Sequence, residues 1–276
     1  MRKAVAAAIL EHAGRAMKKP FLVVFLFVPL VLFSQELRIA SYNMERLGQN
    51  HKDYSAVARV VADFDIVAAE EVMNGNGMSD VLARLGGGWA DFMSTQGEGS
   101  RHYQEHFGFF FDDKVELSRD LGEYARANEF FRPPYGAQFR VKSTGFTFNL
   151  VACHIVYGRN ERERVAELRH LEEVYQYFDG LTENKGRTII AGDFNEEKAA
   201  DFASLTDHGD RDVIPAGGTT IGTHGPDHFY DHMFIPAALQ ARVEKADVDY
   251  WTTDYVGSRR NESDHFPVFV VLDVRE

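Results

Sequence analysis

The stretch TIIAGDFN, residues 188–195, sets a pattern that recurs along the chain. Its first four residues are uncharged and rich in β-branched side chains, which favours a short buried strand. Gly192 lets the backbone turn after that strand, so Asp193 and Asn195 emerge where the strand meets a loop. A carboxylate and an amide at such a place either build the turn or bind a metal and orient a water. This stretch by itself leaves both interpretations open.

Other predicted strands also end in polar residues, which favours the functional interpretation. These residues are Asn43, Glu71, His154, the pair Asp264 and His265, and Asp231 at the start of YDHMFI. Hard oxygen ligands of this kind suit Mg²⁺, with Mn²⁺ as the alternative. We therefore expect a divalent-metal site where these strands end.

Three histidines raise the alternative of a zinc site, because they recur every four residues at 224, 228 and 232. Zinc sites on helices use that spacing, since it places the ligands on one face. Here a Gly-Pro pair and the start of a strand interrupt the segment, which disfavours a helix. We expect no zinc at these positions.

Composition indicates a folded domain with an acidic surface. The chain has 276 residues, of which 45% are hydrophobic, and a formal net charge of −12. This balance argues against a broad basic surface for nucleic acid, although a metal within a carboxylate cluster reverses the local field. The single cysteine, Cys153, excludes an intramolecular disulfide.

The first 35 residues are predicted to be a signal peptide. Lys18 and Lys19 precede a mostly apolar run, residues 21–33, which is shorter than the roughly 20 residues that span a bilayer. Met17 begins a complete signal peptide by itself and is a candidate start of the protein. We expect residues 36–276 to be secreted or periplasmic, without a membrane span after processing. An uncleaved membrane anchor is the alternative.

Strands and helices alternate from residue 37 onward. Apolar spacing predicts helices over 52–64 and 159–178, and a shorter one capped by Ser79. Hairpins are predicted over 106–118 and around 143–145. Because strands occur both in hairpins and around helices, mixed sheets are expected, packed face to face with helices outside. One domain accounts for the whole segment.

Six short motifs occur in the order typical of one protein superfamily. They are SYN (41–43), DIVAAEEV (65–72), LVACHIV (150–156), GDFN (192–195), YDHMFI (230–235) and SDHFPV (263–268). Together they cover essentially all of 37–276, and the chain resembles the endonuclease/exonuclease/phosphatase superfamily, which has the deoxyribonuclease I-like fold. The resemblance implies an α/β fold, a four-layered α/β sandwich of two mixed β-sheets packed face to face with helices on the outer faces. The active site would lie at one rim.

The resemblance also implies a role for each strand-end residue. Asn43 and Glu71 would hold the divalent metal, with Asp264 near it. His265, paired with Asp231, would deprotonate a water. Asp193 and Asn195 would orient the phosphate together with the water. His154 would protonate the leaving group.

One segment, RHYQEHFGFFFDDKVEL (101–117), most resembles the deoxyribonuclease I branch. There Glu105 would partner His154, and Tyr103 would lie beside it at the substrate. Arg132 would contact a phosphate. The alternatives are an exposed strand-edge glutamate for Glu105 and a surface arginine beside a proline turn for Arg132.

Two departures from the family pattern accompany the resemblance. Glu70 stands where the family often has Gln, and His232 stands where deoxyribonuclease I-like proteins commonly have Arg. The second departure weakens the expectation of a contact with the DNA backbone at that position.

These features together predict a secreted, Mg²⁺-dependent phosphodiesterase that hydrolyses DNA and acts as a monomer without a stable protein partner. The first alternative is a phosphodiesterase or phosphatase for phospholipids such as sphingomyelin or phosphoinositides. The second is a binding module without catalysis. The full set of expected acid, base and metal positions argues against the second, because binding alone needs no acid–base pair.

Overall fold

The computed structural model describes residues 35–49, 52–100, 103–183, 185–252 and 262–275. The predicted signal peptide and the candidate start at Met17 lie outside these ranges, apart from Gln35. Residues from Gln35 onward form one compact unit. Within the described ranges, no helix has both the length and the apolar character needed to cross a membrane.

One sheet contains seven strands in the order β12-β13-β1-β2-β5-β3, with β4 paired to β5. Its strands are β1 (Glu36–Leu47), β2 (Ile66–Val72), β3 (Trp89–Met93), β4 (Glu98–Ser100), β5 (Tyr103–Asp112), β12 (Val243–Val248) and β13 (Val268–Asp273). β1 and β2 run parallel, while β1–β13, β2–β5 and β12–β13 are antiparallel. The sheet is therefore mixed.

The other sheet contains six strands in the order β10-β11-β9-β8-β7-β6. Its strands are β6 (Val115–Glu123), β7 (Tyr135–Val141), β8 (Thr147–His154), β9 (Thr188–Asp193), β10 (Arg211–Asp212) and β11 (Asp231–Ile235). β8 and β9 are parallel, and their neighbours β7 and β11 run antiparallel to them. This sheet is mixed as well.

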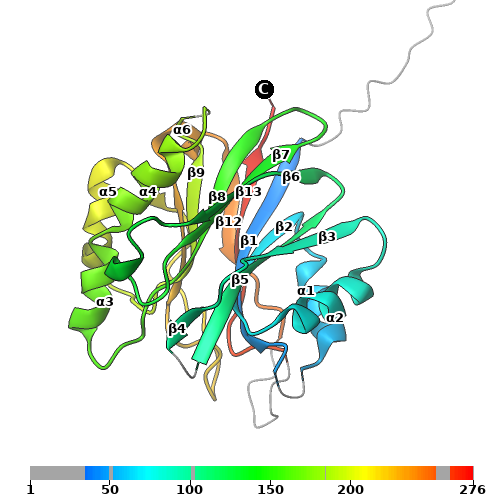
Figure 1. The fold of residues 1–276 in the computed structure, drawn as a ribbon, viewed down its shortest axis with the longest axis horizontal. Coiled ribbons are helices and arrows are strands. Elements are labelled where there is room, and N and C mark those ends of the chain that lie inside the picture. The colour runs from blue at the N-terminus through cyan, green and yellow to red at the C-terminus, as the bar shows by residue number, and fades with distance from the viewer. Residues whose placement is uncertain (1–34, 50–51, 101–102, 184, 253–261, 276) are drawn as a thin grey trace, which may run out of the picture. The chain divides into compact units, whose positions relative to one another are not determined.

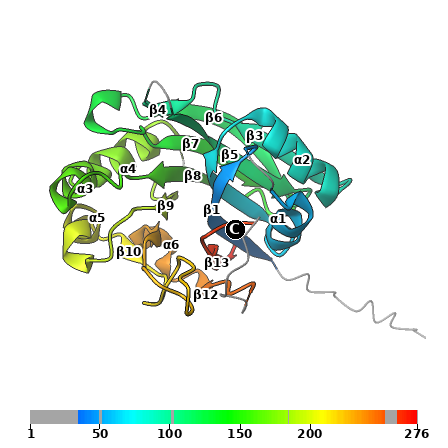
Figure 2. The same cartoon turned by 90° about the horizontal axis from the view of Figure 1, so that it is seen from below.

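The two sheets pack face to face around one apolar core, and helices cover their outer faces (Figures 1 and 2). Successive side chains of a strand point to opposite faces, so a strand between two layers buries both sets. On β8, Phe148 and Leu150 enter the core between the sheets, whereas Val151 and Cys153 pack under the helices. The predicted four-layered α/β sandwich is confirmed.

Two groups of helices make the outer layers (Figure 1). The first group packs on the seven-stranded sheet and comprises α1 (Tyr54–Val61) and α2 (Gly75–Leu85). The second packs on the six-stranded sheet and comprises α3 (Glu161–Leu168), α4 (Leu171–Gly180) and α5 (Ala203–His208). Shorter pieces are α6 (Ala237–Gln240) and the 3₁₀ helices Ala127–Glu129 and Ala199–Phe202.

Two helix predictions were wrong in their boundaries. The predicted helix over 159–178 is interrupted between α3 and α4, where the His170 amide bonds to the Glu167 carbonyl and tightens the turn. Leu168 and Leu171 stay buried on both sides, so the apolar spacing does not reveal the break. The helix α2 begins after Asn74, whose side chain accepts from two amides of the first turn, and not at Ser79.

The hairpin predicted over 106–118 was also wrong. Its two strands, β5 and β6, are consecutive but belong to different sheets. The Asp112 amide bonds to the Asp65 carbonyl, while Val115 pairs with Val141 of β7. A tight turn between two apolar strands therefore joins the two layers here, whereas the hairpin predicted around 143–145 is confirmed by the β7–β8 pair.

Gly192 is a position where β9 can hold only glycine. Its φ is 155°, and a Cβ added there would lie 1.8 Å from the carbonyl oxygen of Cys153 on β8. That neighbour is backbone in the centre of a sheet, so it cannot move aside without breaking the β8–β9 pairing.

We predict that Gly192→Ala lowers the free energy of unfolding by about 3 kcal/mol or more, because the added methyl group overlaps fixed backbone. The control is Gly180→Ala at the end of α4, where an added Cβ meets nothing within 4 Å. That change should shift stability by less than about 1 kcal/mol. Urea unfolding measures both. Equal stability of the two variants would contradict the close approach at Gly192.

Candidate active site

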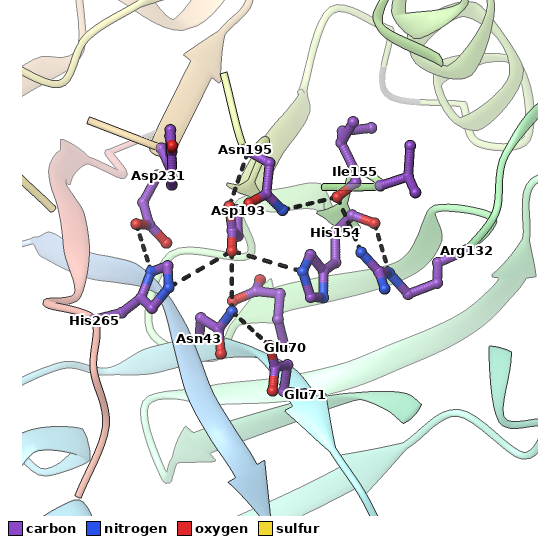
Figure 3. A network of polar contacts seen from close by, with 12 residues as sticks. Asn43, Glu70, Glu71, Arg132, His154, Ile155, Asp193, Asn195, Asp231 and His265 are labelled. Carbon is purple, nitrogen blue, oxygen red and sulfur yellow. Dashed lines mark hydrogen bonds and ion pairs between the residues drawn. The ribbon is translucent and has the colours of Figure 1, made fainter. Parts of the chain in front are cut away.

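Strand ends from both sheets meet at one rim and bring the predicted residues together (Figure 3). In the six-stranded sheet, Asp193 on β9 lies between His154 on β8 and Asp231 on β11, with both as register partners. In the seven-stranded sheet, Asn43 on β1 pairs with Glu70 on β2. Adjacent strands thus deliver their polar residues at the same level of the sandwich.

Asp193 is the centre of the arrangement. The Asn43 side-chain amide donates to Asp193 Oδ2 over 3.0 Å, and the Asn195 backbone amide donates to Oδ1 over 2.9 Å. Two imidazole Nε2 atoms approach Oδ2, that of His154 at 3.6 Å and that of His265 at 3.7 Å. The two predicted catalytic histidines therefore lie on either side of one buried carboxylate (Figure 3).

His265 is held by the carboxylate predicted to partner it. Its Nδ1 lies 2.8 Å from Asp231 Oδ2, and both residues are buried. Although burial opposes it, the negative charges of Asp231, then Asp193, raise the pKa of His265 well above its usual range. Thr219, whose hydroxyl accepts from the Asp231 amide over 3.0 Å, holds the start of β11 in place. The pair has the geometry of an imidazole whose basicity is increased by a carboxylate.

His154 is held in the same way by Glu105. Its Nδ1 bonds to Glu105 Oε1, and Glu105 is 1% exposed. Burial and the nearby Arg132 charge lower the pKa of His154, but Glu105 and Asp193 outweigh them, so the net pKa is raised. Protonated imidazole is thereby favoured at this position. The alternative of an exposed strand-edge glutamate is wrong.

Arg132 is buried, and the alternative of a surface arginine is therefore wrong. Its guanidinium donates to the carbonyl oxygens of His154 at 2.9 Å and Ile155 at 3.0 Å, and its Nε lies 3.2 Å from Glu105 Oε1. The side chain also lines the cleft, where it can reach a phosphate. It thus connects the His154 strand end, its carboxylate partner and the substrate side of the site.

The predicted metal ligands come together only in part. The Asn43 amide nitrogen lies 3.4 Å from Glu71 Oε1, and the Tyr103 hydroxyl donates to Glu71 Oε2 over 3.1 Å. Asp264 stays apart, with its side chain 56% exposed and Oδ1 4.0 Å from His265 Nε2.

The donor set of the cleft fits a divalent cation bound by oxygen. Glu71 and Glu105 form one compact group with His154, and Asp193 and Asp231 form another with His265. So many carboxylates at one rim repel one another unless positive charge is supplied. Oxygen-rich acidic surroundings of this kind suit hard divalent cations.

Backbone strain is concentrated at this rim. Among the described residues, four that are not glycine have a positive φ, namely Glu45 (41°), Arg46 (58°), Glu71 (54°) and Asn195 (52°). Each lies within three residues of Asn43 or is itself a predicted site residue. Left-handed backbone at such residues costs free energy and commonly accompanies function. It re-aims the side chains at the strand ends, which strand periodicity cannot predict.

Sequence reasoning missed the buried support beneath the site. Glu70 is completely buried and accepts from the Ser41 hydroxyl over 2.8 Å. Burial raises the pKa of the Glu70 carboxyl well above its usual range, which favours the neutral acid in place of the amide common in the family. Ser263 donates to the Asn43 carbonyl over 2.6 Å and accepts from the His265 amide, so it joins the ends of two distant segments.

His232 also has a structural role that its sequence position did not reveal. Its two ring nitrogens lie 2.7 Å from Asp212 Oδ2 and 2.9 Å from the Glu196 carbonyl oxygen. Although burial opposes it, the Asp212 contact raises the pKa of His232. The side chain points under the loop that follows Asp193 and is 1% exposed, so it does not reach substrate.

The site opens into a cleft with a volume of about 400 Å³. Its walls combine the two histidines, the acidic residues and an aromatic border: Glu71, Tyr103, Phe131, Arg132, His154, Val156, Tyr157, Gly158, Asp193, Asn195 and His265. Besides His154, all four residues predicted to contact or orient the phosphate or substrate belong to this wall, namely Tyr103, Arg132, Asp193 and Asn195.

No family model matches the sequence. A curated relative from Thioalkalivibrio sp. (strain K90mix), named deoxyribonuclease, is 32% identical over 260 residues, which cover 86% of this chain and 71% of the relative. The chain belongs to the endonuclease/exonuclease/phosphatase superfamily. As a member, it is a phosphoester hydrolase of the nuclease and phosphodiesterase kind.

Solved structures of the endonuclease/exonuclease/phosphatase superfamily share its fold. A family protein from Bacteroides thetaiotaomicron matches with a TM-score of 0.65 at 23% identity, covering 86% of this chain and 97% of that one. A mannosyl-6-phosphatase from the same organism matches with a TM-score of 0.65 at 22% identity, over 85% and 98%. D. rerio TDP2 in complex with a single-strand DNA product matches with a TM-score of 0.59 at 17% identity, over 86% and 98%. At these identities the matches establish the fold.

We predict that Glu105→Gln lowers the pKa of His154, because the substitution removes the negative charge that stabilises the imidazolium. NMR titration of the imidazole nitrogens measures this pKa directly. As a control, Glu116→Gln removes a carboxylate that pairs with Arg140 on the surface. This substitution should leave the pKa of His154 unchanged. An unaltered pKa in Glu105→Gln would contradict the assigned coupling.

Proposed function

We propose that this chain is an exported, Mg²⁺-dependent nuclease that hydrolyses phosphodiester bonds of DNA by in-line attack of water. The observation that carries the proposal is the pair of histidines at the cleft. Each has a carboxylate on Nδ1, and each directs Nε2 to the same carboxylate, Asp193, from 3.6 and 3.7 Å. A base and an acid are thereby available within one site, as phosphodiester hydrolysis requires.

His265 is assigned the role of base. Asp231 holds its Nδ1 and leaves Nε2 facing the attacking water. Because the pKa of His265 is raised, the neutral form that accepts the proton is favoured as the pH rises. Asp193 Oδ2 lies 3.7 Å from that nitrogen, and Asn195 lines the same cleft. The two residues would orient the water and the phosphate.

His154 is assigned the role of acid. With Glu105 on Nδ1, its Nε2 would give a proton to the leaving oxygen. The raised pKa of His154 favours the protonated state that this role needs. Arg132, fixed by two carbonyl oxygens, would place its positive charge against the phosphate.

Glu71, with Asn43 beside it, would hold the divalent cation. Mg²⁺ is the proposed ion and Mn²⁺ the alternative, since both prefer oxygen ligands. When bound, the ion neutralises negative charge on the phosphate oxygens. The exposed position of Asp264 favours an outer role for that residue, in contact with the site through His265.

DNA is proposed as the substrate because the curated relative is named deoxyribonuclease, and because a fold neighbour was solved with a DNA product. The predicted signal peptide supports export. An exported nuclease would meet DNA outside the cell. We propose that it acts as a monomer. The phospholipid alternative needs an apolar surface, yet only three large hydrophobic side chains are exposed among the described residues.

We predict that the full chain nicks supercoiled plasmid in Mg²⁺ and that EDTA abolishes nicking. His265→Ala and His154→Ala should each lower the rate roughly 10²- to 10⁴-fold, because each removes a proton-transfer group. His170→Gln, between α3 and α4 and outside the cleft, should retain the wild-type rate.

Circular dichroism of each variant distinguishes loss of chemistry from loss of folding. Unchanged nicking by folded His265→Ala would refute the assigned mechanism. Plasmid and single-stranded DNA both left intact by the folded wild-type protein would redirect the function to phospholipids or small phosphoesters, with sphingomyelin and a phosphoinositide as the next substrates assayed.

A further inference from the structure

Exposed aromatic rings are concentrated at the cleft. Among the described residues, the large hydrophobic side chains classed as exposed are Phe131 (42%), Tyr157 (61%) and Tyr250 (44%). Both Phe131 and Tyr157 line the cleft that contains the two histidines, whereas Tyr250 does not. Exposing an aromatic ring to water costs free energy. Two exposed rings beside a reactive site therefore indicate a surface that a ligand covers.

Buried contacts hold the backbone beneath these two rings. The carboxylate of Glu167, itself 5% exposed, accepts from the Phe131 amide over 2.7 Å and from the Val156 amide over 2.9 Å. One side chain therefore ties together the two segments that carry the rings. Arg132 joins the same segments from the other side through the carbonyl oxygens of His154 and Ile155. The backbone that carries the two rings is therefore held in place before a ligand binds, which lowers the entropic cost of binding.

Positive charge accompanies each ring. The Arg132 guanidinium lies 5.5 Å from the centroid of the Phe131 ring, and the Arg164 guanidinium lies 5.7 Å from that of Tyr157. Arg164 also donates to the Tyr157 carbonyl over 2.9 Å, and its Nε lies 3.4 Å from the carboxylate of Glu196, so the guanidinium is fixed and part of its charge is offset. A flat apolar face beside a guanidinium matches a nucleotide, which carries both a base and a phosphate.

The aromatic surface continues outward from Tyr157. The Tyr230 ring meets it edge-on at 6.5 Å between centroids, and the His228 ring stacks on Tyr230 at 4.6 Å with an interplanar angle of 3°. The Tyr230 carbonyl accepts from the Phe194 amide, so this row is anchored to the loop that carries Asp193. Successive bases of one strand could follow such a row.

We propose that Phe131 and Tyr157 form a base-stacking subsite for unpaired nucleotides that flank the reactive phosphodiester, so that single-stranded nucleic acid is the preferred substrate. This inference rests on the proposed nuclease function and specifies its substrate. Duplex bases already stack on each other and offer only their edges, whereas an unpaired base offers a whole face to a ring.

A lipid surface fits these rings less well. Membrane-binding faces combine several adjoining apolar side chains, whereas each ring here has a guanidinium within 6 Å and stands over a cleft rich in carboxylates. The nucleic-acid interpretation uses both the ring and the charge beside it. Vesicle binding therefore serves as a contrary outcome in the test.

The test compares two fluorescein-labelled single-stranded oligonucleotides of equal length in Mg²⁺, with the full chain as enzyme. One is an oligothymidylate, and the other carries tetrahydrofuran abasic residues in place of the central thymidines. The measured quantity is the ratio of kcat/KM for the two. A base stacked on an aromatic side chain contributes roughly 5- to 150-fold in affinity, so the wild-type protein should prefer the base-bearing strand.

Tyr157→Ala and Phe131→Ala should each lower that preference roughly 5- to 150-fold, mainly through KM. Tyr157→Phe retains the ring and should keep most of the preference. The matched control is Tyr250→Ala, which removes an equally exposed ring outside the cleft and should keep the wild-type ratio. Circular dichroism confirms that each variant is folded.

Four results would overturn the proposal. Equal kcat/KM for both strands in the wild-type protein, or an unchanged ratio in both Tyr157→Ala and Phe131→Ala, would refute stacking while leaving the nuclease function intact. Loss of binding to phosphatidylcholine vesicles in Tyr157→Ala, with the base preference unchanged, would assign the rings to a membrane. No cleavage of either strand or of plasmid by the folded wild-type protein would refute the nuclease function and this subsite with it.

Discussion

The buried carboxylate of Asp193 is the interaction on which the site depends. Two amide donors and two imidazole nitrogens surround it, and they come from four segments of the chain. A buried carboxylate without such partners would be costly, so the carboxylate and its neighbours stabilise one arrangement together. Its place on β9, between β8 and β11, makes the six-stranded sheet the frame of the site.

The site also depends on a fixed distance and orientation between the two sheets, because both contribute residues to it. Asn43 and Glu71 belong to one sheet, and His154, Asp193 and Asp231 belong to the other. The apolar core between the sheets therefore sets the distances across the cleft, because close-packed interiors transmit small displacements. Gly192 allows a close backbone approach between β9 and β8, one residue before the central carboxylate.

Much of the fold and many of the site residues could be predicted from sequence, because strand periodicity and the ordered motifs are local signals. The hairpin over 106–118 could not, since a turn between strands of two sheets has the same local pattern as a turn within one. The break between α3 and α4 also escaped prediction, because both sides share one apolar stripe. The supporting role of Glu70 and Ser263 could not be predicted, although Glu70 stands out as a departure from the family pattern, because buried polar support is recognisable only from its partners.

The sequence by itself determined which chemical groups the predicted strand ends offer, from Asn43 to His265, and that a carboxylate and an amide occur where β9 ends. Only the tertiary structure decided that Glu105 and Arg132 are buried against His154, and that Asp264 remains exposed. The physical reason is that side-chain direction along a strand repeats every two residues, whereas the contacts of the site join residues that lie 22, 49 or 150 positions apart. Those contacts depend on how two sheets pack, which no local pattern encodes.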